Sequence, residues 1–105
     1  MCCVVVENFD DCMSTDDGLN YVGTVSQTLS GRTCQQWSSQ VPNEHFYTDI
    51  DMFPDILAEE VADVSNYCRN PVAGTVRKSM PWCYVDNTNS NLTWEFCNVP
   101  RCKGT

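Results

Sequence analysis

The sequence has little positive charge and no long apolar segment. Its 6 lysine and arginine residues stand against 14 aspartates and glutamates, which gives a formal net charge of −8 over 105 residues. A chain with this charge is repelled by phosphate backbones and by anionic lipid surfaces. No apolar run approaches the roughly 20 residues that a membrane-spanning helix requires. The composition therefore predicts neither a nucleic-acid partner nor insertion into a membrane.

Groups suited to catalysis are also scarce. His45 is the single histidine, and it belongs to no recognisable serine or cysteine nucleophile motif. Carboxylates lie close in sequence at Asp49 and Asp51 and at Glu59 and Glu60. An acid-rich chain produces such pairs by chance, and they usually face water. We therefore predict that the domain is not an enzyme and uses no cofactor.

Cysteine, by contrast, is abundant, with 8 residues. A domain of this size buries only about two-thirds of the surface that its unfolded chain exposes, so its core alone would give marginal stability. Zinc ligands usually come in closely spaced pairs, whereas Cys97 and Cys102 have no matching pair and Cys2 and Cys3 are adjacent. The cysteines therefore predict disulfides rather than a metal site. Stable disulfides indicate a secreted or extracellular protein.

The strand and helix signals are short. Segments 20–28, 80–85 and 92–99 are rich in β-branched and aromatic residues, and glycines separate them, which predicts small antiparallel hairpins. Apolar residues within 53–64 fall near helical spacing, after a proline and an aspartate that suit a first helical turn. This pattern predicts at most a short helix near 55–64.

Several motifs in the chain together resemble one family. In order, they are “YVGT” at 21–24, “SGRTCQQW” at 30–37, “PNEH” at 42–45, “NYCRNP” at 66–71, “PWCYV” at 81–85 and “WEFCNVPRC” at 94–102. On these motifs the chain resembles a kringle domain. The resemblance implies a kringle at 12–102, an N-terminal extension at 1–11 and a C-terminal tail at 103–105. The implied fold is small and disulfide-rich, mostly loops with short antiparallel β-ribbons.

The resemblance also implies a disulfide pairing that the sequence alone could not choose among the many possible for six cysteines. The implied pairs are Cys12 with Cys102, Cys34 with Cys83, and Cys68 with Cys97. Cys2 and Cys3 fall outside this pattern. Adjacent cysteines rarely bridge one another without strain, so these two either pair with a missing segment, link two chains, or are an artefact of expression.

Other motif residues suit structural roles. Trp37 is expected to pack against the disulfides, and Leu57 resembles the apolar residue that fills the kringle core. The single histidine, His45, is expected to be a hydrogen-bonded part of the scaffold rather than a base or a ligand.

Lysine-binding kringles hold the ligand's methylenes in an aromatic trough, its ammonium on an Asp-x-Asp pair and its carboxylate on basic residues. The resemblance places the trough at Trp82, Tyr84, Trp94 and Phe96. Where the lysine binders read Asn-Pro-Asp-x-Asp, residues 70–74 read Asn-Pro-Val-Ala-Gly, and Thr93 replaces a frequent basic residue. Both carboxylates are therefore missing, and we predict that the domain binds neither free lysine nor a C-terminal lysine.

The loop before “PWC” is longer than in those relatives, and it carries Arg77 and Lys78. These cations either favour a carboxylate or an acidic peptide beside the trough, or are solvated and neutralise neighbouring acids. Asp86 or the acids of 48–55 could still supply a new anionic centre for lysine. Asn91 begins the sequon “NLT” and is a candidate glycosylation site of a glycoprotein.

The function that follows is a non-catalytic extracellular module that binds a protein or peptide ligand. Its parent is predicted to be a receptor ectodomain or a multidomain secreted protein. Two alternatives remain: an accessory kringle of a secreted serine protease, and a stand-alone secreted effector or inhibitor.

Overall fold

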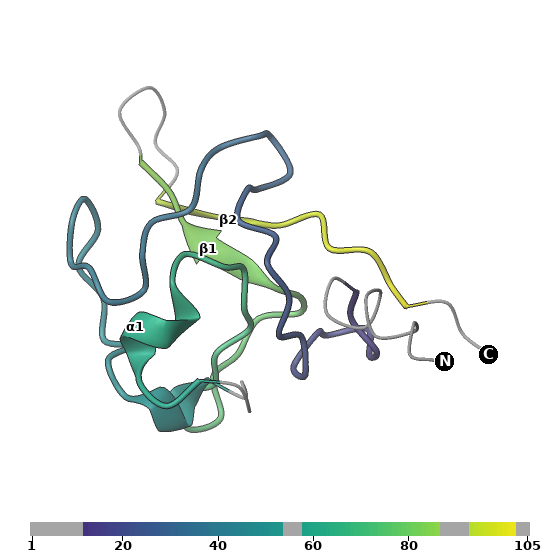
Figure 1. Ribbon diagram of the computed structural model, residues 1–105, viewed down its shortest axis with the longest axis horizontal. Helices are drawn as coiled ribbons and strands as arrows, with labels where there is room; N and C mark the ends of the chain where they lie inside the picture. Colours follow the sequence, from purple (N-terminus) through teal and green to yellow (C-terminus); the bar gives the residue numbers. More distant parts are fainter. Residues whose placement is uncertain (1–11, 54–57, 87–92, 103–105) are drawn as a thin grey trace, which may run out of the picture.

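The computed structural model describes residues 12–53, 58–86 and 93–102 (Figure 1). Its regular elements are the 3-10 helix η2 at Ile50–Met52, the α-helix α1 at Val61–Val64, and the strands β1 at Trp82–Tyr84 and β2 at Trp94–Phe96. The rest of the described chain is loops, turns and isolated bridges. The expected small disulfide-rich fold with little helix is confirmed, and β1 and β2, within segments 80–85 and 92–99, form the expected antiparallel ribbon. Segment 20–28, also expected to form a strand, makes only isolated bridges at Gln27 and Thr28. Among the described residues no helix is long and apolar enough to cross a bilayer.

The predicted helix is confirmed as short and lies at the end of the expected range. It begins after Glu60, because the carboxylate of Asp63 accepts hydrogen bonds from the backbone amides of Glu59 (3.0 Å) and Glu60 (3.2 Å). It ends at Ser65, whose φ of 57° leaves the helical region. Residues 54–57, which include the expected first turn and Leu57, lie outside the described part. A helix this short depends on packing rather than on its own stability.

Three disulfides connect the loops, and they are the pairs that the kringle resemblance implies: Cys12–Cys102, Cys34–Cys83 and Cys68–Cys97. The last two lie side by side in the core, with the Cys34 and Cys68 sulfurs 3.7 Å apart. The four inner sulfurs are close enough to suggest a metal site, but disulfide sulfurs are not the thiolates that a metal requires. Cys2 and Cys3 lie outside the described residues.

The outer bridge joins the two ends of the domain. The Met13 amide donates to the Pro100 carbonyl (2.9 Å), and the Cys102 amide donates to the Met13 carbonyl (2.9 Å). These bonds place Met13 beside Arg101 in a parallel bridge. The first and last described segments therefore lie side by side (Figure 1).

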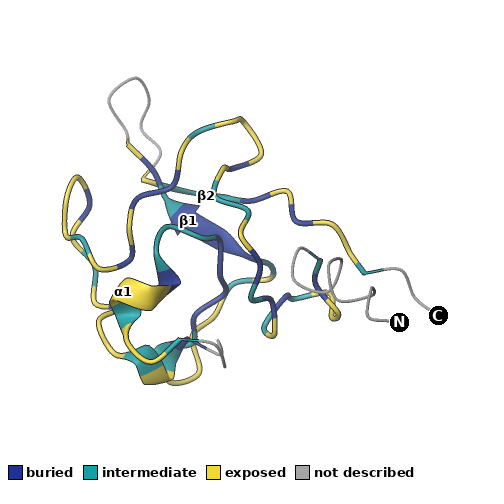
Figure 2. Cartoon of the chain, in the orientation of Figure 1, coloured by how far each residue is buried: buried dark blue, intermediate teal, exposed yellow. Residues whose placement is uncertain are grey.

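The core is centred on Trp37, which is 1% exposed and belongs to the same buried cluster as the four inner cysteines. Its indole Nε1 donates a 2.7 Å hydrogen bond to the Tyr67 carbonyl. Five rings lie within 6.1 Å of it, centroid to centroid: His45, Tyr47, Phe53, Trp82 and Tyr84. Figure 2 shows that β1, which contributes Trp82 and Tyr84 to this cluster, is mostly buried. The core therefore consists of one aromatic cluster around Trp37 and two disulfides, and not of packed layers of helices or sheets.

Candidate ligand-binding site

The register of the ribbon gathers aromatic side chains on one face. Trp82 pairs with Phe96 and Tyr84 pairs with Trp94, while Cys83 pairs with Glu95. Because side chains alternate between the faces of a strand, the four aromatic residues share one face. The Trp82 and Trp94 ring centroids are 5.7 Å apart, and those of Trp94 and Phe96 are 5.0 Å apart. We call Trp82, Tyr84, Trp94 and Phe96 the aromatic face.

The members of the aromatic face differ in accessibility. Trp82 is 1% exposed, because it packs inward against Trp37 at 5.2 Å as well as against its strand neighbours. Tyr84, Trp94 and Phe96 are half-buried and keep surface for a ligand. Burial raises the pKa of the Tyr84 phenol, with Tyr47 nearby adding to the shift, so this hydroxyl stays neutral. The face is therefore uncharged and mainly apolar.

His45 packs against Tyr84 of the aromatic face. Its ring stacks on Tyr84 with centroids 5.2 Å apart and planes 17° apart. Its Nδ1 accepts a hydrogen bond from the Tyr47 amide (3.1 Å), so its Nε2 carries the proton and donates to the Ser39 carbonyl (3.0 Å). Both ring nitrogens are engaged, which agrees with the structural role expected for this histidine.

A lysine of the chain itself lies on the aromatic face. The Nζ of Lys78 is 3.8 Å from the centroid of the Trp94 ring and 4.8 Å from that of Trp82. An ammonium at this distance is attracted by the electron-rich faces of both indoles. In the part of the chain that the structure describes, no carboxylate pairs with Lys78. The loop before β1 thus places a cation over Trp94 and Trp82 of the aromatic face.

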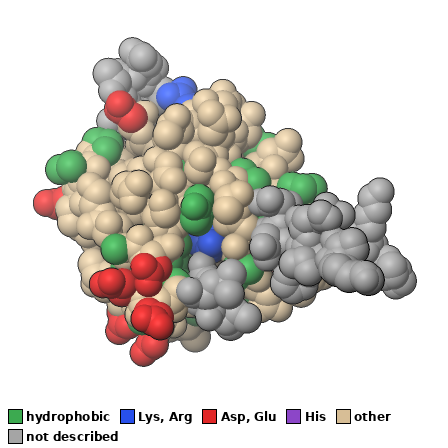
Figure 3. Space-filling model, in the orientation of Figure 1, with side chains coloured by type: hydrophobic (Ala, Val, Ile, Leu, Met, Phe, Trp, Pro, Cys, Tyr) green, Lys and Arg blue, Asp and Glu red, His purple; other side chains and the backbone are tan. Residues whose placement is uncertain are grey.

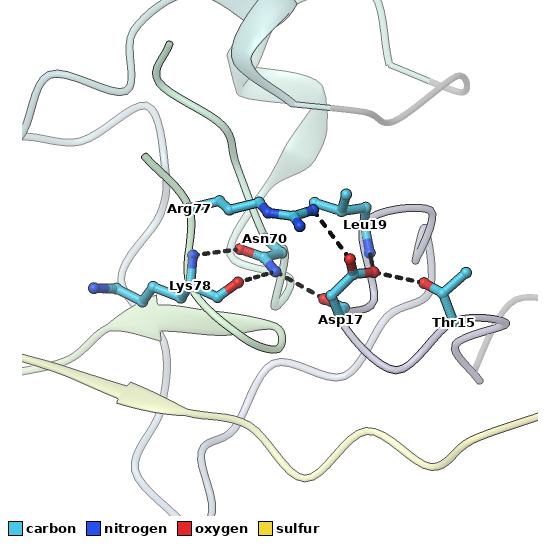
Figure 4. Close-up of polar contacts among 6 residues, drawn as sticks. All are labelled: Thr15, Asp17, Leu19, Asn70, Arg77 and Lys78. Atoms are coloured by element: carbon cyan, nitrogen blue, oxygen red, sulfur yellow. Dashed lines mark hydrogen bonds and ion pairs between the residues drawn. The ribbon is translucent and has the colours of Figure 1, made fainter. Parts of the chain in front are cut away.

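A buried amide fixes the position of Lys78, as Figure 4 shows. Asn70 is 1% exposed and donates from Nδ2 to the carbonyls of Lys78 (2.9 Å) and Asp17 (2.7 Å). Its Oδ1 accepts from the Lys78 amide (3.3 Å). Because a buried amide that loses these partners would pay a desolvation penalty, the network resists movement of the Lys78 backbone.

Arg77 is directed away from the aromatic face. Its guanidinium forms a 3.0 Å ion pair with Asp17 (Figure 4). The pKa of Asp17 is lowered, chiefly by the hydrogen bond from the Thr15 hydroxyl and then by that from the Leu19 amide, with Arg77 adding to the effect. Asp17 is therefore ionised at neutral pH, where it forms the ion pair with Arg77. Of the two predicted cations, only Lys78 lies on the aromatic face.

The segment that carries the anionic centre in lysine binders forms an uncharged turn here. The Val72 amide donates to the Met52 carbonyl (2.8 Å). Ala73 and Val76 exchange hydrogen bonds of 2.9 Å across a turn in which Gly74 has φ of 65°. No side chain from 72 to 76 carries a charge. The turn therefore contains no carboxylate side chain.

The acids of the middle segment belong to another part of the surface. Asp49, Glu59 and Glu60 line an open hollow of about 620 Å³, together with the apolar side chains of Ile50 and Val61. Figure 3 shows acidic side chains gathered at the end of the molecule that carries the two short helices. The described lining of this hollow includes none of Trp82, Tyr84, Trp94, Phe96 or Lys78.

Two residues of this arrangement were not predicted as site residues. Asn70 was visible in the “NYCRNP” motif, but no sequence pattern indicated that it would hold the backbone of Lys78. Asp17 lies 60 residues before its partner Arg77, and nothing in the sequence connects the two. Asn91, the candidate for glycosylation, lies outside the described residues.

Together, the three disulfides, the short ribbon and the aromatic face define a small disulfide-rich binding module without catalytic machinery among its described residues. The kringle domain family matches residues 12–102 of this chain. The chain belongs to the kringle family. It is therefore an extracellular module of a kind that mediates protein interactions and is not itself catalytic.

Two relatives illustrate the family's range. Apolipoprotein(a)-like protein 2 of Homo sapiens is 43% identical over 86 residues, which cover 82% of this chain and 56% of the relative. Plasminogen of Capra hircus is 40% identical over 96 residues, which cover 91% of this chain and 68% of the relative. The chain thus spans little more than half the length of the first relative.

Proposed function

We propose that this kringle is an extracellular protein-interaction module that recognises neither free lysine nor a C-terminal lysine. The observation that carries the proposal is the position of Lys78, whose ammonium lies over Trp94 and Trp82. An incoming lysine would need the same aromatic surface and would meet a like charge there. The segment at 72–74, where lysine binders carry their carboxylates, supplies no acid to offset this repulsion.

The proposal predicts that 6-aminohexanoate, a minimal mimic of a C-terminal lysine, causes no saturable change in tryptophan fluorescence below millimolar concentrations. Trp82 and Trp94 lie at the trough, so a ligand bound there would alter the signal. A lysine-binding kringle, titrated under the same conditions, is the positive control. Saturation in the micromolar range that hexanoate, which lacks the ammonium, does not reproduce would mean that other acids supply an anionic centre, and the proposal would be wrong.

For the whole protein, we infer a multidomain secreted parent. The likeness to apolipoprotein(a)-like protein 2 and to plasminogen supports this parent over a receptor ectodomain. An accessory kringle of a secreted serine protease and a stand-alone secreted effector or inhibitor are the alternatives. A full-length transcript decides between them, because trypsin-like sequence would establish the protease parent and a transmembrane segment would establish the receptor.

A further inference from the structure

We propose that Lys78 is the recognition cation of a carboxylate-binding site on the aromatic face. The ligand class is a carboxylate on an apolar stem, contributed by a peptide or protein partner. The inference rests on the proposed function, because it requires that the trough does not accept an ammonium. The proposed site would bind an anion where lysine-binding kringles bind an ammonium, and it would use the same apolar surface.

The first support is the unused bonding capacity of Lys78. A lysine ammonium has three N–H donors. Contact with the faces of Trp94 and Trp82 stabilises the charge but leaves donors for an acceptor. Within the described ranges, no side chain or carbonyl accepts a hydrogen bond from this Nζ, and no carboxylate pairs with it. Lys78 is half-buried, so part of this residue remains exposed to solvent.

The second support is that the cation is positioned before any ligand arrives. Asn70 fixes both the amide and the carbonyl of Lys78. The two indoles then limit the freedom of the ammonium itself. A long lysine side chain that is already ordered loses less conformational entropy when it binds an anion. This arrangement differs from that of Arg77, whose charge is already neutralised by Asp17.

The third support is the surface beside the cation. Trp94 and Phe96 are half-buried neighbours, with ring centroids 5.0 Å apart, and they offer apolar contact for the stem of a ligand. A charge-assisted hydrogen bond to the carboxylate and apolar burial of the stem would then act together. The net charge of −8 opposes an anionic ligand at long range, so binding would depend on the short-range contact with Lys78.

The test compares three ligands of six carbons each, namely hexanoate, hexanamide and hexylamine, titrated into the intact oxidised domain. We expect hexanoate to bind in the millimolar range, about tenfold more tightly than hexanamide, since one charge-assisted contact is the difference. Hexylamine is expected to bind least well. The preference for hexanoate should weaken as salt is added, because the contact is partly exposed.

Two variants assign the effect to one residue. Lys78→Met keeps a long apolar stem over the indoles but removes the charge, so it should abolish the preference for hexanoate over hexanamide. Arg77→Met is the matched control, since it removes the neighbouring cation that is paired with Asp17. This control should keep the preference. Near-UV circular dichroism checks that both variants retain the native aromatic packing.

The outcomes separate the inference from the function on which it rests. Equal binding of hexanoate and hexanamide, a preference that survives Lys78→Met, or an equal loss in Arg77→Met would overturn the carboxylate site alone. Tight binding of hexylamine would overturn the proposed function as well. If the site is confirmed, a peptide with a free C-terminal carboxylate and an amidated peptide with an internal glutamate would identify the source of the carboxylate.

Discussion

Replacing both Cys68 and Cys97 with alanine is expected to lower the free energy of unfolding by about 2–5 kcal/mol. This bridge joins residues 29 positions apart, and both cysteines are fully buried. Its loss would release loop entropy in the unfolded chain and leave a gap beside the Cys34–Cys83 bridge, whose Cys34 sulfur is 3.7 Å from that of Cys68. Urea unfolding without reductant, with the other bridges intact, measures the change.

The control replaces Cys12 and Cys102 with alanine. That bridge joins residues 90 positions apart, so the loop-entropy term is larger by about 1 kcal/mol, but both residues are partly exposed and little core packing is lost. The outer variant should therefore keep a native near-UV circular dichroism spectrum, while the inner variant should lose part of it. A loss below about 1 kcal/mol for the inner pair would show that the loops pack without this covalent support.

Trp37→Ala is expected to cost about 3–5 kcal/mol, the range for deleting a large buried aromatic side chain. Trp37 contacts rings on several separate segments, so its removal disconnects parts of the chain that have little regular structure to hold them. The change also removes the hydrogen bond to the Tyr67 carbonyl. Equilibrium urea unfolding, followed by the fluorescence of the remaining tryptophans, measures the loss.

Phe46→Ala serves as the matched control, because Phe46 is also aromatic and lies close in space to the same cluster but is 61% exposed. Its loss is expected to cost less than about 1 kcal/mol. Similar losses in the two variants would mean that Trp37 is not the centre of the core. Trp37→Phe should fall between them, because it keeps a ring but gives up the indole hydrogen bond.

The ribbon could be predicted from the β-branched and aromatic residues of segments 80–85 and 92–99. The four aromatic residues of its face were named from the resemblance to kringles, and not from the alternation of side chains. The helix was only partly predictable. Apolar spacing marked the region, but hydrogen bonds from two backbone amides to Asp63 decide that α1 begins at Val61. The disulfide pairs came from the kringle motifs and not from the spacing of the cysteines.

The position of Lys78 could not be predicted, because contacts between distant segments determine it. Arg77 and Lys78 are adjacent in sequence and look equivalent there. In the fold, Asp17 binds one and the indoles hold the other. Asn70 hydrogen bonds to both Asp17 and Lys78, which are 53 and 8 residues from it in sequence. Which of the two cations lies on the aromatic face is therefore decided by tertiary structure.

The closeness of Cys12 and Cys102, whose Cα atoms are 4.8 Å apart, makes the domain easy to insert. Because its two ends lie so close together, the domain could be inserted into a loop of a host protein with little change to that loop. Domains before and after it in the chain could then remain neighbours. Tension applied along such a host would pass through the Cys12–Cys102 cross-link instead of stretching the loops between. The aromatic face would then keep its geometry in a protein under mechanical load.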